Sequence, residues 1–204
     1  MNRVITIGRE FGSGGRELGR RLAVELGYEY YDKEVLTEIV KHTELSESYV
    51  QDVIDGRAHR LYPISIEQSI NIALDYSMMQ IQDIYRAQTE VIKKMANTSD
   101  CVIVGRCADY ILADEPDVKL YRIFVYADMD SRVKRCFDRA SEDEQYTDKE
   151  MRKYINKIDK DRASFYEDYT LQKWGDKANY DLCINTTNLD IQTVVPRIAQ
   201  VFKD

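Results

Sequence analysis

The chain has 204 residues, of which 44% are hydrophobic and 32% are charged, as is typical of a globular protein with its own core. The formal net charge of -7 argues against a general nucleic-acid-binding protein, which normally carries a basic excess. The four cysteines are dispersed and the two histidines lie far from them, so we expect neither a zinc site nor a disulfide framework. No apolar stretch approaches the ~20 residues of a membrane span and the N-terminus lacks a signal-peptide pattern, so we expect a reduced, cytoplasmic setting.

Short apolar segments alternate with helical patterns along the chain. The segments that we expect to form strands are residues 4–7, 28–31, 101–104, 120–126 and 182–185. The segments with helical spacing of apolar residues are 18–26, 33–41, 46–54, 66–95, 129–140, 148–169 and 191–202. Gly27 is placed to end the first helix, and Thr147 with Glu150 fits a capping box. Because the strands are continuously apolar, we predict an α/β domain whose parallel sheet is covered by helices on both faces.

Four glycines fall in the eight residues between the first strand and the first helix: Gly8, Gly12, Gly14 and Gly15. A loop without Cβ atoms lets backbone N–H groups and the N-terminus of the next helix approach phosphate oxygens closely. A tight turn that binds nothing needs only one or two glycines. This density of glycines around Ser13 therefore favours phosphate binding.

The loop departs from the standard phosphate-loop pattern G-x-x-x-x-G-K-[ST]. If Gly14 is the second glycine, Gly15 takes the lysine slot and Arg16 the Ser/Thr slot. If Gly15 is the second glycine, Arg16 takes the lysine slot and Glu17 the Ser/Thr slot. We prefer the second register, because Arg16 then supplies the missing cation as a two-pronged phosphate ligand.

Neither register contains the first glycine, because Arg9 or Glu10 stands in its place, and neither offers the hydroxyl that normally binds Mg²⁺. Glu17 is a candidate metal ligand, although a carboxylate beside phosphates is repelled unless a metal is present. The dinucleotide pattern G-x-G-x-x-G is a weaker alternative. It has Glu17 in place of its third glycine, although Asp32 ends the second strand at about the usual distance.

Several segments together resemble the cytidylate-kinase-like family over nearly the whole chain. These segments are Ile5-Thr6-Ile7-Gly8-Arg9-Glu10-Phe11-Gly12-Ser13-Gly14-Gly15-Arg16-Glu17-Leu18-Gly19, Tyr30-Tyr31-Asp32-Lys33-Glu34, Val102-Ile103-Val104-Gly105-Arg106-Cys107-Ala108-Asp109-Tyr110, Asp159-Lys160-Asp161-Arg162-Ala163 through Tyr169, Trp174-Gly175-Asp176, Asn179-Tyr180-Asp181-Leu182 and Asn185-Thr186.

The resemblance implies a P-loop kinase-like α/β/α domain over residues 1–204 with a five-stranded parallel sheet. Residues 33–98 are expected to form a helical region of the type that binds nucleoside monophosphates, and residues 139–170 a mobile lid. The resemblance also implies ATP and Mg²⁺ as cofactors, with transfer of a phosphoryl group to a small phosphorylated acceptor such as CMP or dCMP. It leaves the metal ligands unassigned.

Two sets of residues are predicted to form the site. The catalytic set is Arg16, Asp32, Arg106 and Arg162, and the nucleotide-binding set is Gly12, Ser13, Gly14, Gly15, Arg16, Glu17, Arg132 and Lys160. Asp32 follows a strand end, where ligands bind in open α/β sheets, but it equally suits a helix N-cap. Arg106 follows a buried strand and suits an acceptor phosphate better than a structural ion pair. Asp109 is a weaker candidate, because its position is also typical of an exposed helix residue.

The basic residues in the second half of the chain have competing interpretations. Arg132 and Arg135 lie one turn apart, and family members often carry arginines here near the nucleotide. A solvated helix face is the alternative. Arg162, with Lys160, is predicted to meet the transferring group from the lid. Its alternative is a basic surface stripe paired with Asp159, Asp161 and Glu167.

The leading functional hypothesis is therefore a small-molecule kinase. The missing lysine and hydroxyl keep two alternatives open: a non-catalytic nucleotide sensor, and a sulfate- or phosphate-binding domain without nucleotide specificity. We expect a nucleotide and a small phosphate acceptor as ligands, and neither nucleic acid nor a membrane as a partner. The long apolar stripe of residues 66–95 is core or a subunit contact, and its length raises the prospect of a homodimer.

Overall fold

The computed structural model describes residues 1–43, 45–57, 70–140 and 146–203, with the backbone alone for residues 70–78. The strands are β1 (Asn2–Arg9), β2 (Glu29–Tyr31), β3 (Cys101–Val104), β4 (Val118–Tyr126) and β5 (Leu182–Asn185). The helices are α1 (Gly15–Leu26), α2 (Lys33–Thr43), α3 (Glu47–Ile54), α4 (Ile70–Thr98), α5 (Ala108–Ile111), α6 (Met129–Phe137), α7 (Asp148–Thr170), the 3₁₀ turn η2 (Lys177–Asn179) and α8 (Ile191–Gln200).

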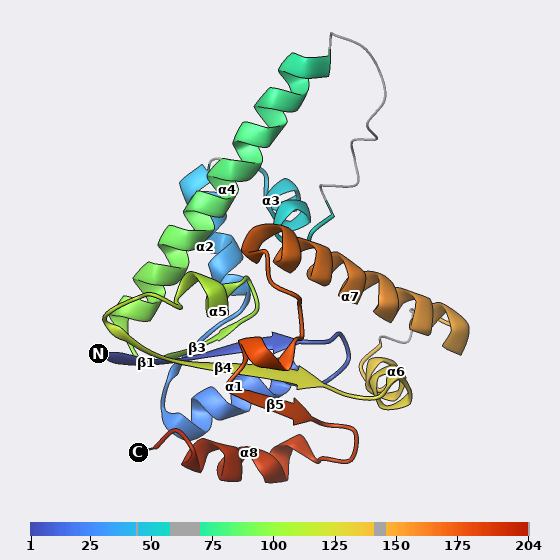
Figure 1. Cartoon of the computed structure of the whole chain (residues 1–204). Coiled ribbons are helices and arrows are strands. Elements are labelled where there is room, and N and C mark those ends of the chain that lie inside the picture. Colours follow the sequence, from blue (N-terminus) through green and yellow to red (C-terminus); the bar gives the residue numbers. More distant parts are fainter. Residues whose placement is uncertain (44, 58–69, 141–145, 204) are drawn as a thin grey trace.

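The five strands form one all-parallel sheet in the order β2-β3-β1-β4-β5 (Figure 1). In its register Ile7 lies beside Val104 of β3 and Ile123 of β4, and Arg9 lies beside Val125. The chain segments that follow β1, β2 and β3 therefore emerge at the same edge of the sheet. The dinucleotide-binding alternative is wrong, because that fold places its second strand beside the first, whereas here β3 separates them.

Helices cover both faces of the sheet, which confirms the predicted three-layer architecture (Figure 1). On one face, α1 and α8 pack against the apolar side chains of the central strands, including Ile5, Ile7 and Val125. On the other face, a larger core joins α2, α3, α4, α5 and α7, with Ile84 and Ile92 of α4 fully buried. A small third cluster of Val133, Met151 and Ile155 joins α6 to α7.

The predicted elements differ from the observed ones mainly at their ends. The first strand extends to Arg9, two residues beyond the predicted end, because pairing with β4 continues there. The helix predicted over 129–140 ends at Phe137, and the last helix ends at Gln200. Gly27 ends α1 in a left-handed conformation, and the capping box of Thr147 and Glu150 opens α7, both as predicted.

The long apolar stripe belongs to α4, and its described side chains from Ile81 onward are core residues. Residues 66–69 of the predicted stripe lie outside the described residues, as do the side chains of residues 70–78. The homodimer therefore stays a prediction. Within the described residues, none of the helices is long and apolar enough to cross a membrane.

Gly56 lets α3 approach α7 closely. It follows α3 with a φ of +74°, and a Cβ atom built on it would lie 2.4 Å from the backbone oxygen of Asp161 on α7. A side chain at this position would therefore meet both a strained backbone conformation and a backbone atom that cannot turn away.

We expect Gly56→Ala to lower the free energy of unfolding by roughly 2–4 kcal/mol, because α3 must move away from α7. Gly27→Ala is the matched control. Gly27 has a φ of +70° but no atom within 4 Å of a built Cβ, so only the left-handed conformation is penalised, by about 1 kcal/mol. Urea unfolding of both variants measures the difference, and equal losses would contradict the close approach as the cause.

Candidate functional site

The glycine loop ends at the N-terminus of α1. Gly14 is the N-cap with a φ of +82°, a conformation that favours glycine, and Cδ1 of Ile191 lies 2.3 Å from where a Cβ would stand. Among the described residues, the backbone N–H groups of Gly12, Gly14 and Arg16 have no acceptor. Free N–H groups at the positive end of a helix form a ready binding site for phosphate.

The serine of the loop faces into the protein. Ser13 is fully buried, and its hydroxyl donates to the carbonyl of Glu10 at 2.8 Å. The hydroxyl of Thr186, at the end of β5, donates in turn to the Ser13 carbonyl at 2.7 Å. Ser13 therefore holds the shape of the loop from behind, and its hydroxyl lies outside both cavities described below.

Arg9 and Arg16 share one carboxylate at the carboxyl edge of the sheet. Asp32 lies 2.6 Å from Nε of Arg16 and 3.7 Å from Nη2 of Arg9. Asp32 directly precedes α2, where a carboxylate can cap the helix. However, none of the backbone N–H groups of the described residues donates a hydrogen bond to this carboxylate. Burial and the neighbouring Arg162 cation lower the pKa of Arg9 to about 9, so Arg9 remains charged at neutral pH.

Arg106 stands on an unusual turn after β3. Gly105, Arg106 and Cys107 have φ angles of 75°, 60° and 53°, a left-handed run that L side chains rarely adopt. The turn aims Arg106 at α3, where Nη1 contacts Oδ1 of Asp55 at 2.8 Å. The structural ion pair considered for Arg106 is thus present, and the same side chain also lines a cavity. Strained conformations of this kind concentrate at ligand-binding sites.

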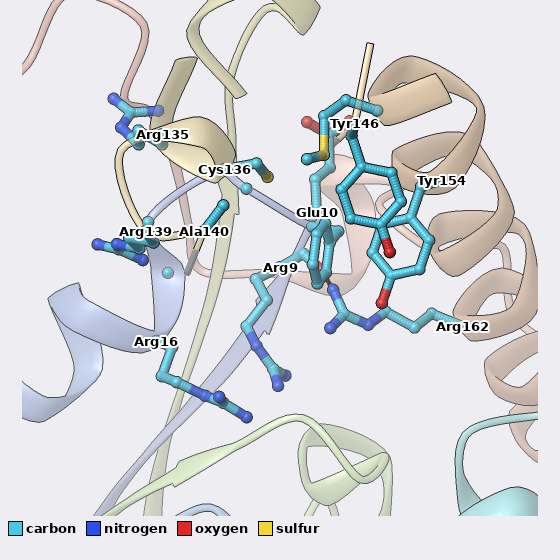
Figure 2. A pocket seen from close by; sticks show the side chains of 15 residues that line it. Arg9, Glu10, Arg16, Arg135, Cys136, Arg139, Ala140, Tyr146, Tyr154 and Arg162 are labelled. Carbon is cyan, nitrogen blue, oxygen red and sulfur yellow. Dashed lines mark hydrogen bonds between the residues drawn. The ribbon is translucent and has the colours of Figure 1, made fainter. Parts of the chain in front are cut away.

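Arg162 reaches the same region from α7. Its Nη1 donates to the carbonyl of Arg9 at 3.3 Å, and its guanidinium lies over the Phe11 ring at 5.5 Å from the centroid. Burial lowers the pKa of Arg162, whereas the nearby Asp159 carboxylate raises it. The side chains of Arg9, Arg16 and Arg162 point toward one common region (Figure 2).

Two cavities meet at these three arginines. The first, about 340 Å³, lies over the glycine loop between α1, α6 and α7, and we call it the loop cavity. The second, about 390 Å³, lies between the strand ends, α2, α3 and α7, and we call it the edge cavity. Arg9, Arg16 and Arg162 line both, so a ligand in either cavity approaches the same cations.

The loop cavity combines cations with aromatic rings. Arg135 and Arg139 line it from the α6 side, and Tyr146 and Tyr154 line it from the α7 side (Figure 2). The two tyrosine rings stack with centroids 6.1 Å apart, and both are more than two-fifths exposed. Exposed aromatic faces beside a phosphate site provide a surface on which a nucleobase can stack.

The edge cavity has an apolar wall and one buried acid. Phe165, Trp174 and other aromatic residues line it. Asp109, only 8% exposed, accepts a hydrogen bond from the Tyr166 hydroxyl at 2.9 Å. Burial raises the pKa of the Asp109 carboxyl, and the bond from Tyr166 only partly offsets this effect. The exposed helix position considered for Asp109 is therefore wrong.

A network of charged groups fixes the loop to α6 and α7. Arg132 is 6% exposed, forms a short ion pair with Asp159 and donates to the Phe11 carbonyl at 2.7 Å. Asp159 accepts from the Phe11 N–H at 2.7 Å, and Glu10 lies 3.2 Å from Nη1 of Arg132. The solvated helix face considered for Arg132 is wrong, because this side chain is a buried connection between three elements.

The predicted residues thus divide into two groups. The structure brings Gly12, Gly14, Gly15, Arg16, Arg106 and Arg162 to the cavity walls, with Asp32 behind Arg16. Four others line neither cavity: Ser13 and Arg132 face inward, Glu17 pairs with Arg21 and Arg139, and Lys160 is exposed on α7.

The sequence interpretation missed Arg9 and the two tyrosines of the loop cavity. In the sequence Arg9 stands out only as a departure from the first glycine of the pattern, although its place directly after a buried strand is a usable signal. Tyr146 and Tyr154 carried no such signal, because they reach the site only when α7 folds back over the loop. Among the described residues there is no group of three or more His, Cys, Asp or Glu side chains placed to hold a metal ion.

An all-parallel five-stranded sheet in this order, with a glycine loop leading from β1 into α1, defines a P-loop kinase fold like that of shikimate kinase. The chain belongs to the cytidylate kinase-like family, whose model matches residues 4–188. This confirms the resemblance stated from the sequence. None of the curated protein sequences matches the chain.

Solved structures agree with this assignment. An uncharacterized protein from Eubacterium ventriosum is 29% identical, with a TM-score of 0.69 and coverage of 100% of this chain and 99% of that one. Shikimate kinase from Bacteroides thetaiotaomicron is 15% identical, with a TM-score of 0.56 and 98% of both chains covered. A sugar kinase from Janibacter sp. is 11% identical, with a TM-score of 0.53 and coverage of 98% and 94%.

We expect Arg132→Ala to lower the free energy of unfolding by about 3 kcal/mol, because Glu10 loses its cation and the largely buried Asp159 keeps only the long pair with Arg162 at 3.9 Å. The matched control is Arg139→Ala, which removes an ion pair to Glu17 from a side chain that is 52% exposed and should cost at most about 1 kcal/mol. Chemical denaturation of both variants measures the difference. A loss for Arg132→Ala no larger than the control would rule out this buried network as a main anchor of the loop.

We expect Asp109→Asn to stabilise the ligand-free protein at neutral pH. Since the pKa of Asp109 is raised in the folded state, the folded protein binds a proton more readily than the unfolded chain, and the carboxyl costs stability as pH rises through its folded pKa. Asparagine keeps an acceptor for Tyr166 without the charge. Unfolding measured from pH 4 to pH 8 should show the gain growing with pH, and a gain that shrinks with pH would contradict the sign.

Proposed function

We propose that this chain is a phosphotransferase that moves the terminal phosphoryl group of ATP, bound in the loop cavity, to a small phosphorylated acceptor in the edge cavity. The observation that supports this most directly is that the two cavities share Arg9, Arg16 and Arg162. Membership of the cytidylate kinase-like family makes CMP and dCMP the first acceptors to test.

The loop cavity suits a nucleotide. The N–H groups of Gly12, Gly14 and Arg16 and the N-terminus of α1 would hold the phosphates. Arg135 and Arg139 add positive charge, and Tyr146 and Tyr154 offer a stacking surface for the base. The residues present therefore fit a nucleoside triphosphate.

The edge cavity suits a small acceptor that carries an anionic group. Arg106, fixed by Asp55, would meet the acceptor phosphate, while side chains from α2 and α3 close the opposite wall. The part of the chain from 33 to 98 would thereby act as the acceptor-binding region. Residues 139–170 would act as the lid, which carries Arg162 on α7 toward the transferring group.

The chemistry needs position and charge rather than a covalent intermediate. A bond forms between an oxygen of the acceptor and the terminal phosphorus, the bond from that phosphorus to the bridging oxygen breaks, and ADP leaves. Arg9, Arg16 and Arg162 would neutralise the charge that spreads over the transferring oxygens. The low exposure of Arg9 and Arg162, at 13% and 27%, strengthens this effect, since water screens them less.

The described residues offer no pre-built magnesium site. The Asp32 carboxylate already pairs with Arg16 and Arg9, and the described residues hold no metal-binding cluster. Mg²⁺ would arrive on the phosphates of the nucleotide, where it supplies further positive charge and needs at most one or two protein carboxylates.

A coupled assay with ATP, Mg²⁺ and a panel of nucleoside monophosphates tests the proposal. Turnover with one acceptor is expected, and Arg162→Ala should lower kcat by roughly 10²-fold or more, because a cation at the transferring group is lost. Arg152→Ala is the matched control on the same helix, because Arg152 pairs with Asp130 and Asp148 and lines neither cavity. It should leave kcat unchanged.

A second candidate function is a nucleotide sensor without turnover. It is favoured by one observation, the inward-facing hydroxyl of Ser13, which leaves the loop without a hydroxyl for a metal ion. ATP-dependent stabilisation without transfer to any acceptor would support the sensor. An equal loss of turnover in Arg152→Ala and Arg162→Ala would instead reject the role given to Arg162.

A further inference from the structure

The glycine loop carries a charged side chain in an unexpected slot. With Gly14 as the second glycine of G-x-x-x-x-G-K-[ST], the first glycine falls at Arg9 and the lysine falls at Gly15. The chain therefore has a cation where the pattern has glycine, and glycine where the pattern has its cation. The helix begins at Gly15 with Gly14 as its N-cap, which fits this register.

The two positions touch in space. A Cβ atom built on Gly15 would lie 2.7 Å from Cβ of Arg9 and 3.4 Å from its Cδ. Cβ atoms do not approach each other this closely, so a side chain at position 15 and the Arg9 stem exclude one another. The side chain of Arg9 thus occupies the space that a lysine at position 15 would need.

The far end of Arg9 is placed to bind an anion. Nη1 of Arg9 lies 2.5 Å from where a Cβ on Gly105 would stand, so this guanidinium lies directly against the turn after β3. Arg9 lines both cavities, its side chain is only 13% exposed, and its ion pair with Asp32 is long at 3.7 Å. Arg16, by contrast, is 56% exposed and pairs closely with Asp32.

We propose that this loop exchanges the first glycine and the cation of the phosphate-loop pattern, so that the cation is Arg9 and the glycine is Gly15. Arg9 is then the phosphate-binding cation of this loop. This replaces the register preferred from the sequence, in which Arg16 took the lysine slot. The inference rests on the proposed function only in placing the phosphates of the ligand over the loop.

Inorganic tripolyphosphate is the probe, because it tests the loop without a base or an acceptor. Its affinity is measured by calorimetry for the full chain, Arg9→Gly, Gly15→Lys and the double variant. Arg9→Gly should weaken binding at least tenfold, and the double variant should regain most of that loss. Without ligand, Gly15→Lys should have a lower melting temperature than the double variant, because Arg9 still excludes the new side chain. In both variants Cβ of Val125, which lies 3.2 Å from the built Cβ of Gly15, must shift slightly.

A second set of variants keeps the test decisive if lysine at position 15 prevents folding. Arg9→Met keeps the length of the side chain and removes its charge, whereas Arg9→Lys keeps the charge. The first should lose at least tenfold in tripolyphosphate affinity and the second only a few-fold. Arg20→Met is the matched control, because Arg20 is exposed on α1 and lines neither cavity.

Three results would overturn the inference: no binding of tripolyphosphate by the unmodified chain, equal affinities for Arg9→Met and Arg20→Met, or a foldable double variant that binds no better than Arg9→Gly. Failure of the proposed function looks different. Arg9-dependent tripolyphosphate binding without phosphoryl transfer to any acceptor would support this inference and reject the kinase. Transfer at the full rate in Arg9→Met would reject this inference and the role of Arg9 in transfer, and would leave the kinase itself supported.

Discussion

Four arginine guanidiniums gather at the carboxyl edge of one parallel sheet, and the arrangement of the site depends on keeping these like charges together. Arg9, Arg16, Arg106 and Arg162 come from β1, α1, the turn after β3 and α7. Burial and mutual repulsion make the cluster unfavourable, which is why the pKa of Arg9 is lowered. Asp32, Asp55 and Asp159 compensate only part of the charge, since Asp159 also pairs with Arg132. A ligand with several negative charges would relieve the rest, so the cost of the cluster is a physical argument for an anionic substrate.

The rest of the fold holds the cluster in place through contacts that are distant in sequence. The backbone of the loop at Phe11 is held from both sides, by Arg132 on α6 and by Asp159 on α7. Close packing of Gly56 against Asp161 brings α3 to α7, and Arg106 then reaches Asp55 at the end of α3. The loop cavity and the edge cavity consequently meet at side chains whose elements are tied together by these contacts, and the proposed transfer between two bound ligands would need such positioning.

The sequence interpretation succeeded where the signal is local. Continuously apolar segments between helical patterns identified the strands, and the capping box at Thr147 and the glycine at position 27 marked helix ends. It failed where a role depends on what packs around a side chain. Arg132 and Asp109 each occupy positions typical of exposed helix residues, yet both are buried, because α7 folds back over the sheet. Lys160 was expected at the site, but its position on the helix turns it to solvent.

The sequence by itself determined the parallel α/β architecture, the glycine-rich loop between the first strand and the first helix, and the cytidylate kinase-like family, because apolar periodicity, glycine density and motif order are local properties of the chain. Only the tertiary structure decided which cations share a cavity and which side chains of the loop exclude one another. The reason is spatial: Arg9 and Gly15 lie six positions apart, and their mutual exclusion arises from a contact of 2.7 Å that exists only once β1 and α1 are packed together.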